Sequence, residues 1–167
     1  MKKILLYSDS PGFGGHEIMS VRMANALARY YEVHFLYHHV KIAAGLHASV
    51  RPLRIPMYTR VGRLAFLRNA SIPDVIRLRR LIRSISPDLC IILQPAIDFC
   101  LRGAAASRSL GVKTVSYIPR YSSEQTQGVF TRYAADKLFG CYARLFHGFI
   151  TICEVQKKSI DTLTCGS

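Results

Sequence analysis

The sequence has no hydrophobic run long enough to cross a lipid bilayer. A membrane-spanning helix needs about 18–20 consecutive apolar residues, and Arg, Lys, His or Asp interrupts every candidate run in this chain. The start, MKK followed by the apolar run Ile4 to Tyr7, superficially resembles a signal peptide, but the run is too short for one. We therefore expect a cytoplasmic protein.

A cysteine pattern is also missing. The five cysteines, at positions 90, 100, 141, 153 and 165, are odd in number, and no two of them form a CxxC pair. The usual signals for a disulfide framework and for a zinc site are therefore absent. We expect reduced thiols and no bound metal.

Acidic residues are scarce: 10 Asp and Glu stand against 23 Lys and Arg, which gives a formal net charge of +13. The imbalance is sharpest from Lys41 to Arg83, where ten basic residues accompany one acid, Asp74. Such a field attracts anionic partners, and charge alone does not choose between a membrane surface, a nucleic acid and a charged metabolite. A solvated basic surface without a partner accounts for the run about equally well.

What the sequence does contain is a near-strict alternation of strand and helix patterns. Strands are predicted at 4–7, 32–37, 50–55, 88–93, 113–118 and 147–152, and helices at 16–28, 71–86, 98–110, 127–146 and 154–163. This order predicts one α/β domain over residues 1–167, with a Rossmann-like, open, mostly parallel sheet and helices on both faces. In such sheets ligands bind beyond the carboxyl ends of the strands.

Helical periodicity indicates which side chains face the sheet. For the first helix the apolar stripe is Ile18, Val21, Met23, Ala24, Leu27 and Ala28. For the 71–86 helix it is Ile72, Val75, Leu78, Ile82 and Ile85, with Arg77, Arg80 and Arg83 on another face. Small residues around Gly103 should let the 98–110 helix approach the sheet closely, and Gly111 should cap it.

The first strand is followed by the turn PGFGGHE, which opens a helix. Its glycines permit positive φ and close approach of a ligand, and a helix start favours an anion. The turn does not match the dinucleotide-binding fingerprint, because Glu17 stands in place of the third glycine and the second strand ends without the required acidic residue. The GK[ST] of a P-loop is missing too. An anion site at Gly14, Gly15 and His16 remains, or else a simple tight turn with His16 as an ordinary capping residue.

Several segments together resemble one known family. They are KILLYS with PGFGGHE and RMANALAR, then PDLCIILQP, LGVKTVSYIP and FHGFITICEVQKKSI, and they span nearly the whole chain. The chain is similar in these segments to the N-terminal half of a GT-B glycosyltransferase of the glycosyltransferase family 4 type. The resemblance implies one half of a GT-B fold that serves the transfer of a hexose, with retention of configuration, from a nucleotide-sugar to a glycan or lipid-linked acceptor. The nucleotide-sugar is then a co-substrate, and no other cofactor is implied.

The resemblance also implies roles for individual residues. The donor phosphates would lie near Gly14, Gly15 and His16. The acceptor would lie near Gln94, Arg120 and Tyr121, although a structural salt bridge explains Arg120 about equally well. No catalytic residue is assigned, because the family's paired glutamates belong to the C-terminal, nucleotide-binding half, which these 167 residues lack. We expect that half in cis or in trans, and the chain alone to be inactive.

Some relatives of this kind dock on anionic membranes through a basic face. That gives the basic run a specific interpretation, a membrane-surface patch at the inner face of the cell membrane in an enzyme of cell-envelope glycan synthesis. The patch would comprise Arg60, Arg63, Arg68, Arg77, Arg80 and Arg83.

Two departures from the family pattern stand out. Ile118-Pro119-Arg120 replaces a frequent histidine, and Cys153 replaces the usual serine. The alternative function is a non-enzymatic basic module that binds an anionic polymer or nucleic acid. Aromatic residues are not interleaved with the basic run as base-stacking platforms, which disfavours nucleic acid as a partner.

Overall fold

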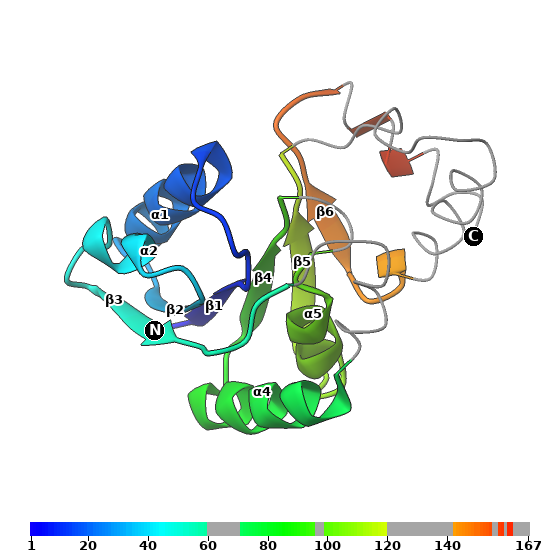
Figure 1. Cartoon of the computed structure of the whole chain (residues 1–167). Coiled ribbons are helices and arrows are strands. Elements are labelled where there is room, and N and C mark those ends of the chain that lie inside the picture. Colours follow the sequence, from blue (N-terminus) through cyan, green and yellow to red (C-terminus); the bar gives the residue numbers. More distant parts are fainter. Residues whose placement is uncertain (60–70, 96–98, 120–141, 155–156, 159, 162–167) are drawn as a thin grey trace.

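The computed structural model describes residues 1–59, 71–95, 99–119, 142–154, 157–158 and 160–161. In them, six strands form one all-parallel sheet in the order β3-β2-β1-β4-β5-β6 (Figure 1). The strands are β1 (Lys3–Ser8), β2 (Glu32–Tyr37), β3 (Val50–Arg54), β4 (Leu89–Leu93), β5 (Lys113–Tyr117) and β6 (Gly148–Ile150). The helices are α1 (Gly15–Leu27), α2 (Lys41–Ala44), α4 (Ile72–Ile85) and α5 (Leu101–Arg108). The predicted Rossmann-like α/β fold is confirmed.

Two hydrophobic cores lie on opposite faces of the sheet. Leu6 of β1 packs with Val21 and Ala24 of α1 in one core. Its neighbours Leu5 and Tyr7 face the other core, which α4 and α5 cover (Figure 1). Because both faces of β1 are buried, its sequence is a continuous apolar run without alternation.

The strand order reverses next to β1. The chain builds β1, β2 and β3 toward one edge and then crosses over to place β4, β5 and β6 on the other side of β1. A crevice suited to a ligand opens at such a reversal, beyond the carboxyl ends of β1 and β4. Pro52 lies in β3 at the sheet edge, as predicted, where its missing N–H leaves no ladder bond unmade.

Two predicted core positions are wrong. Ile18 of α1 is 44% exposed and Ile72 of α4 is 71% exposed. Each lies about 110° around its helix from the centre of the buried face, at roughly 100° per residue. On α1 the buried side includes Glu17 and Ser20 instead, so polar residues occupy positions that the hydrophobic pattern assigned to apolar ones.

The glycine turn does not use positive φ. Among the described glycines only Gly111 has a positive φ, at 73°, and it follows α5 as the predicted cap. Ser86 ends α4 with a φ of 53°. The helix predicted at 127–146 lies largely outside the described residues, whereas the described residues of the helix predicted at 154–163 (154, 157–158 and 160–161) are helical.

Gly103 brings α5 against the sheet, as the small residues of this helix predicted. A Cβ atom at this position would lie 2.7 Å from Cγ of Tyr7 and closer still to two other atoms of the same ring. Tyr7 is fully buried in β1, so its ring has no space into which to move. The close contact therefore requires glycine.

We expect Gly103→Ala to lower the free energy of unfolding by roughly 1–3 kcal/mol, because the added methyl overpacks the contact with Tyr7. Urea denaturation followed by circular dichroism measures the change. Gly12→Ala is the control, since its Cβ would meet no atom within 4 Å. Equal midpoints for the two variants would contradict the close contact.

Candidate functional site

The carboxyl ends of the strands carry a concentration of polar side chains. Asp9 follows β1, Gln94 follows β4 and Tyr117 ends β5. The N-terminus of α1, with the glycine turn, lies at the same edge (Figure 1). The region divides into a closed polar cluster around Asp9 and an open part around His16.

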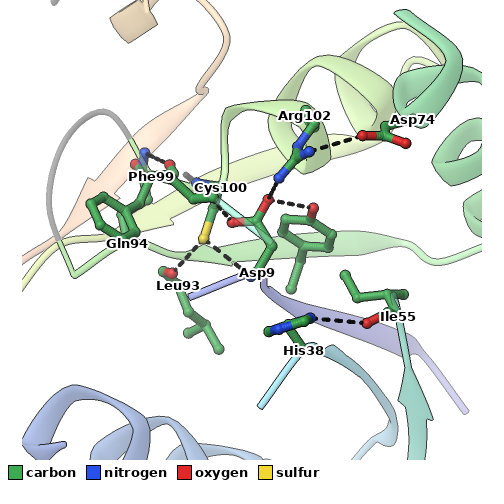
Figure 2. Close-up of polar contacts among 11 residues, drawn as sticks. Asp9, His38, Ile55, Asp74, Leu93, Gln94, Phe99, Cys100 and Arg102 are labelled. Carbon is green, nitrogen blue, oxygen red and sulfur yellow. Dashed lines mark hydrogen bonds and ion pairs between the residues drawn. The ribbon is translucent and has the colours of Figure 1, made fainter. Parts of the chain in front are cut away.

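Asp9 is the centre of the closed cluster and has no exposed surface. Its carboxylate accepts hydrogen bonds from Tyr7 Oη at 2.9 Å, from Thr59 Oγ1 at 2.5 Å and from Arg102 Nη2 at 3.0 Å (Figure 2). The backbone N–H of Asp9 points to Sγ of Cys100 at 3.5 Å, and that thiol in turn donates to the Leu93 carbonyl at 3.1 Å. Segments distant in the sequence are thereby tied to the end of β1.

Arg102 extends the cluster to α4. Its Nη1 donates to Oδ2 of Asp74 at 2.9 Å, so one guanidinium bridges two carboxylates (Figure 2). Burial lowers the pKa of Arg102, but the charges of Asp9, Tyr7 and Asp74 and the hydrogen bond to Asp9 together outweigh burial, so the pKa is raised. Burial, and then the charge of Asp9, also raise the pKa of Tyr7, which keeps its hydroxyl a donor. Arg102 therefore stays charged and Tyr7 stays protonated at neutral pH, so both act as hydrogen-bond donors that hold the structure together.

Gln94 is held inside the protein. It is 1% exposed; its Oε1 accepts from Ser116 Oγ at 2.5 Å, and its Nε2 donates to the Phe99 carbonyl at 2.6 Å. That Gln94 contacts the acceptor substrate stays a prediction. Such a contact would require the side-chain amide to give up one of these hydrogen bonds. Arg120 and Tyr121, the other predicted acceptor residues, lie outside the described residues.

The side chain of Glu17, a residue of α1, partly caps the start of this helix. Oε2 of Glu17 accepts the backbone N–H of Gly14 at 2.8 Å, and Glu17 is buried. A carboxylate therefore already satisfies one of the donors that a bound anion would use. Space around the turn is open, because a Cβ at Gly15 would meet no atom within 4 Å.

His16 is a half-buried polar residue at this end of the sheet. Its ring stacks on Tyr117 with centroids 5.7 Å apart and an interplanar angle of 16°. Both ring nitrogens are buried, and neither makes a hydrogen bond of good geometry with the described residues, although the Leu93 carbonyl lies near the ring. Burial lowers the pKa of His16, while the Glu17 carboxylate and the Leu93 carbonyl act in the opposite sense. The ring is neutral at pH 7 and offers one donor and one acceptor.

The structure thus brings part of the predicted site together. His16 meets Tyr117 through its ring, and the backbone N–H of Gln94 donates to the Tyr117 carbonyl at 3.0 Å. Arg77, Arg80 and Arg83 lie apart from this edge, exposed on α4. Arg60, Arg63 and Arg68 lie outside the described residues.

Pattern analysis missed Asp9, Thr59, Arg102 and Tyr117. Two of them carried a signal: Asp9 directly follows a fully apolar strand, and Arg102 begins a helix of otherwise small residues. A charged residue at either place needs a partner if the surroundings are buried. Thr59 had no such signal, because its role depends on a loop from the far edge of the sheet.

In the described part of the chain, no three His, Cys, Asp or Glu side chains gather as a metal site requires. None of the described helices is both long enough and apolar enough to cross a bilayer.

No protein-family model and no curated protein matches the sequence. Solved structures do. Anabaena HepE in complex with UDP and glucose has a TM-score of 0.69 at 14% identity, over 98% of this chain and 42% of that one. The lipopolysaccharide outer core galactosyltransferase WaaB has a TM-score of 0.59 at 18% identity, over 98% and 43%. The complex of MnaA from S. aureus with UDP has a TM-score of 0.58 at 15% identity, over 90% and 38%.

The chain has the fold of a GT-B domain. The part of the resemblance that concerned the fold is therefore confirmed, while membership of family 4 stays a prediction. The chain spans about two fifths of the length of these solved structures.

We expect Arg102→Met to lower the free energy of unfolding by about 3–5 kcal/mol, because it leaves the buried Asp9 carboxylate without its countercharge. Thermal and urea denaturation measure the loss. Arg77→Met removes an exposed arginine that has no partner among the described residues, and it should change stability by less than about 0.5 kcal/mol. Equal stability of the two variants would show that the buried pair does not hold the fold.

Proposed function

We propose that the chain is the acceptor-binding half of a glycosyltransferase that uses a nucleotide-sugar. The observation that carries this is His16, whose buried ring nitrogens make no hydrogen bond of good geometry with the described residues, beside an open glycine turn. It lies at the edge where a sheet of this order binds ligands. HepE and MnaA, which share the fold, are complexes with UDP.

The proposed donor contact follows from the chemistry of the turn. A phosphate oxygen accepts a hydrogen bond from the neutral His16 ring, and Gly15 allows it to approach the backbone because no Cβ stands in the way. Glu17 keeps the Gly14 N–H occupied, which confines the contact to the later N–H groups of the first turn of α1. The positive end of the helix dipole adds to the attraction.

The rest of the enzyme is proposed by analogy with the fold. The acceptor, a glycan or a lipid-linked sugar, lies beyond the ends of β4 and β5, near Gln94, Arg120 and Tyr121. A second α/β domain, in cis or in trans, binds the nucleotide and supplies the catalytic groups, so the 167 residues alone are inactive. A hexose is transferred with retention, and the anomeric configuration of the product, measured by NMR, tests that part: an inverted product would refute it.

We expect UDP-glucose, titrated into the ¹⁵N-labelled chain, to shift the amide signals of Gly15 and His16. Gly15→Ala should weaken this binding roughly tenfold, because a methyl group occupies the space of the phosphate. Gly12→Ala, a change in the same turn with equally open surroundings, should leave the affinity unchanged.

Equal effects of the two substitutions would contradict a phosphate contact at Gly15. If the chain ignores UDP-glucose but binds heparin or single-stranded DNA with strong salt dependence, the non-enzymatic alternative is correct instead.

We further propose that α4 places the protein on the cytoplasmic face of the membrane, where it would serve cell-envelope glycan synthesis. Arg77, Arg80 and Arg83 are exposed and form no ion pair with the described residues. Ile72 and Ile76 are exposed on the same helix. Exposed aliphatic side chains next to arginines suit an anionic lipid surface.

The chain should sediment with vesicles that contain phosphatidylglycerol and not with neutral phosphatidylcholine vesicles. Changing Arg77 and Arg80 to Glu should abolish this binding, since each lost basic residue contributes about 1 kcal/mol near such a surface. The matched control changes Arg22 and Arg29, two exposed arginines in and just after α1 on the other face of the sheet. Loss of binding in the control as well would indicate general charge attraction and no role for α4.

A further inference from the structure

A pocket lies at the amino ends of the strands, on the opposite side of the sheet's length from His16. It has a volume of about 370 Å³ and opens between the C-terminal ends of α4 and α5, which pack together (Figure 1). Arg79, Arg83, Ser86 and Ser109 line it, with apolar surface from Leu110 and Val112. Ser86 is two residues before Asp88, where the chain turns into β4, so the pocket belongs to the amino-terminal edge of the sheet.

The carbonyl groups at these helix ends already have donors. Oγ of Ser86 donates to the Arg83 carbonyl at 2.8 Å, and Oγ of Ser109 donates to the Ala106 carbonyl at 2.8 Å. Nζ of Lys3 donates to the Ile85 carbonyl at 3.3 Å. Since the helix ends are satisfied in this way, the two arginines of the pocket are not needed to cap them.

The arginines of the pocket have no counter-ion. The side chains of Arg79 and Arg83 form no hydrogen bond or ion pair with the described residues, and none of the described residues that line the pocket is acidic. Asp88, the nearest acid along the chain, accepts the backbone N–H of Lys3 at 2.7 Å. Asp74 lies in the first turn of the same helix and binds Arg102. Two guanidinium groups thus share one concave site without a neutralising charge.

We propose that this pocket binds a phosphate ester. Two guanidinium groups match the oxygens of a phosphate, which arginine binds in bidentate fashion. Leu110 and Val112, both partly exposed, provide apolar surface for the carbon part of the ester. The volume lies at the lower end of the roughly 300–1,000 Å³ typical of small-molecule sites. The phosphate comes from a lipid headgroup or from a soluble metabolite, since the recognition chemistry is the same.

The site is independent of the proposed sugar transfer, because it lies at the amino ends of the strands and shares no residue with the glycine turn. Failure of one proposal would leave the other standing.

Glycerol 3-phosphate is the soluble probe. Titrated into the ¹⁵N-labelled chain, it should shift the amide signals of Ser86 and Ser109, and Arg79→Gln should weaken its binding about tenfold. The matched control is Arg77→Gln, which removes the same charge from the same helix outside the pocket and should have little effect. Arg79→Lys, which keeps the charge but loses the bidentate geometry, should fall between the wild type and Arg79→Gln. Circular dichroism establishes that the variants are folded.

Phosphatidylglycerol vesicles distinguish the two sources. If the ester is a lipid headgroup, Arg79→Gln weakens vesicle binding clearly more than Arg77→Gln does. If it is a soluble metabolite, the two variants bind vesicles alike while only Arg79→Gln loses glycerol 3-phosphate. Equal loss of both ligands in the two variants, or no binding of either, would overturn the proposal.

Discussion

The buried ion pair between Asp9 and Arg102 is the constraint on which the carboxyl edge of this domain depends. Asp9 stands where β1 ends, at the point of strand reversal, and a carboxylate without exposed surface is stable only with full hydrogen bonding and a countercharge. Meeting that need fixes Thr59 from beyond β3 and Arg102 from α5, and through Arg102 also Asp74 of α4. One carboxylate thereby sets how three segments meet β1.

The hydrogen bonds within the Asp9 cluster determine which polar groups at this end of the sheet remain available to a ligand. Asp9, Tyr7 and Arg102 hold one another through buried hydrogen bonds, and the raised pKa values of Tyr7 and Arg102 keep both groups protonated. On the α1 side, neither ring nitrogen of His16 makes a hydrogen bond of good geometry with the described residues, and an open turn lies before it. The sheet connects His16 to the rest of this end of the domain, since Tyr117, on which His16 stacks, belongs to the strand next to β4.

The fold could be predicted from the sequence because its signals are local and repeated: runs such as Ile4 to Tyr7 have the continuous apolar character that only doubly covered parallel strands show. The glycine turn and His16 were found for the same reason, as a local motif after a strand. The Asp9–Arg102 pair could not be found, because 93 residues separate its members and nothing nearby in sequence marks their contact. Ile18 and Ile72 were wrongly assigned to the core. Hydrophobicity alone does not reveal that Glu17 caps its own helix, nor where a helix extends past the end of the sheet.

The arginines of the chain differ in how deeply they are buried and in whether they have acidic partners. Arg102 is buried and paired with two acids, so its cost of desolvation is offset inside the protein. Arg79 and Arg83 line a pocket with no acid among its described residues, and Arg77 and Arg80 stand in solvent on the same helix. With 10 acids against 23 basic residues, the chain has too few carboxylates to neutralise these groups internally. Anions from outside the chain must therefore balance the excess of basic residues, whether they are solvent ions, a phosphate ester or a lipid surface.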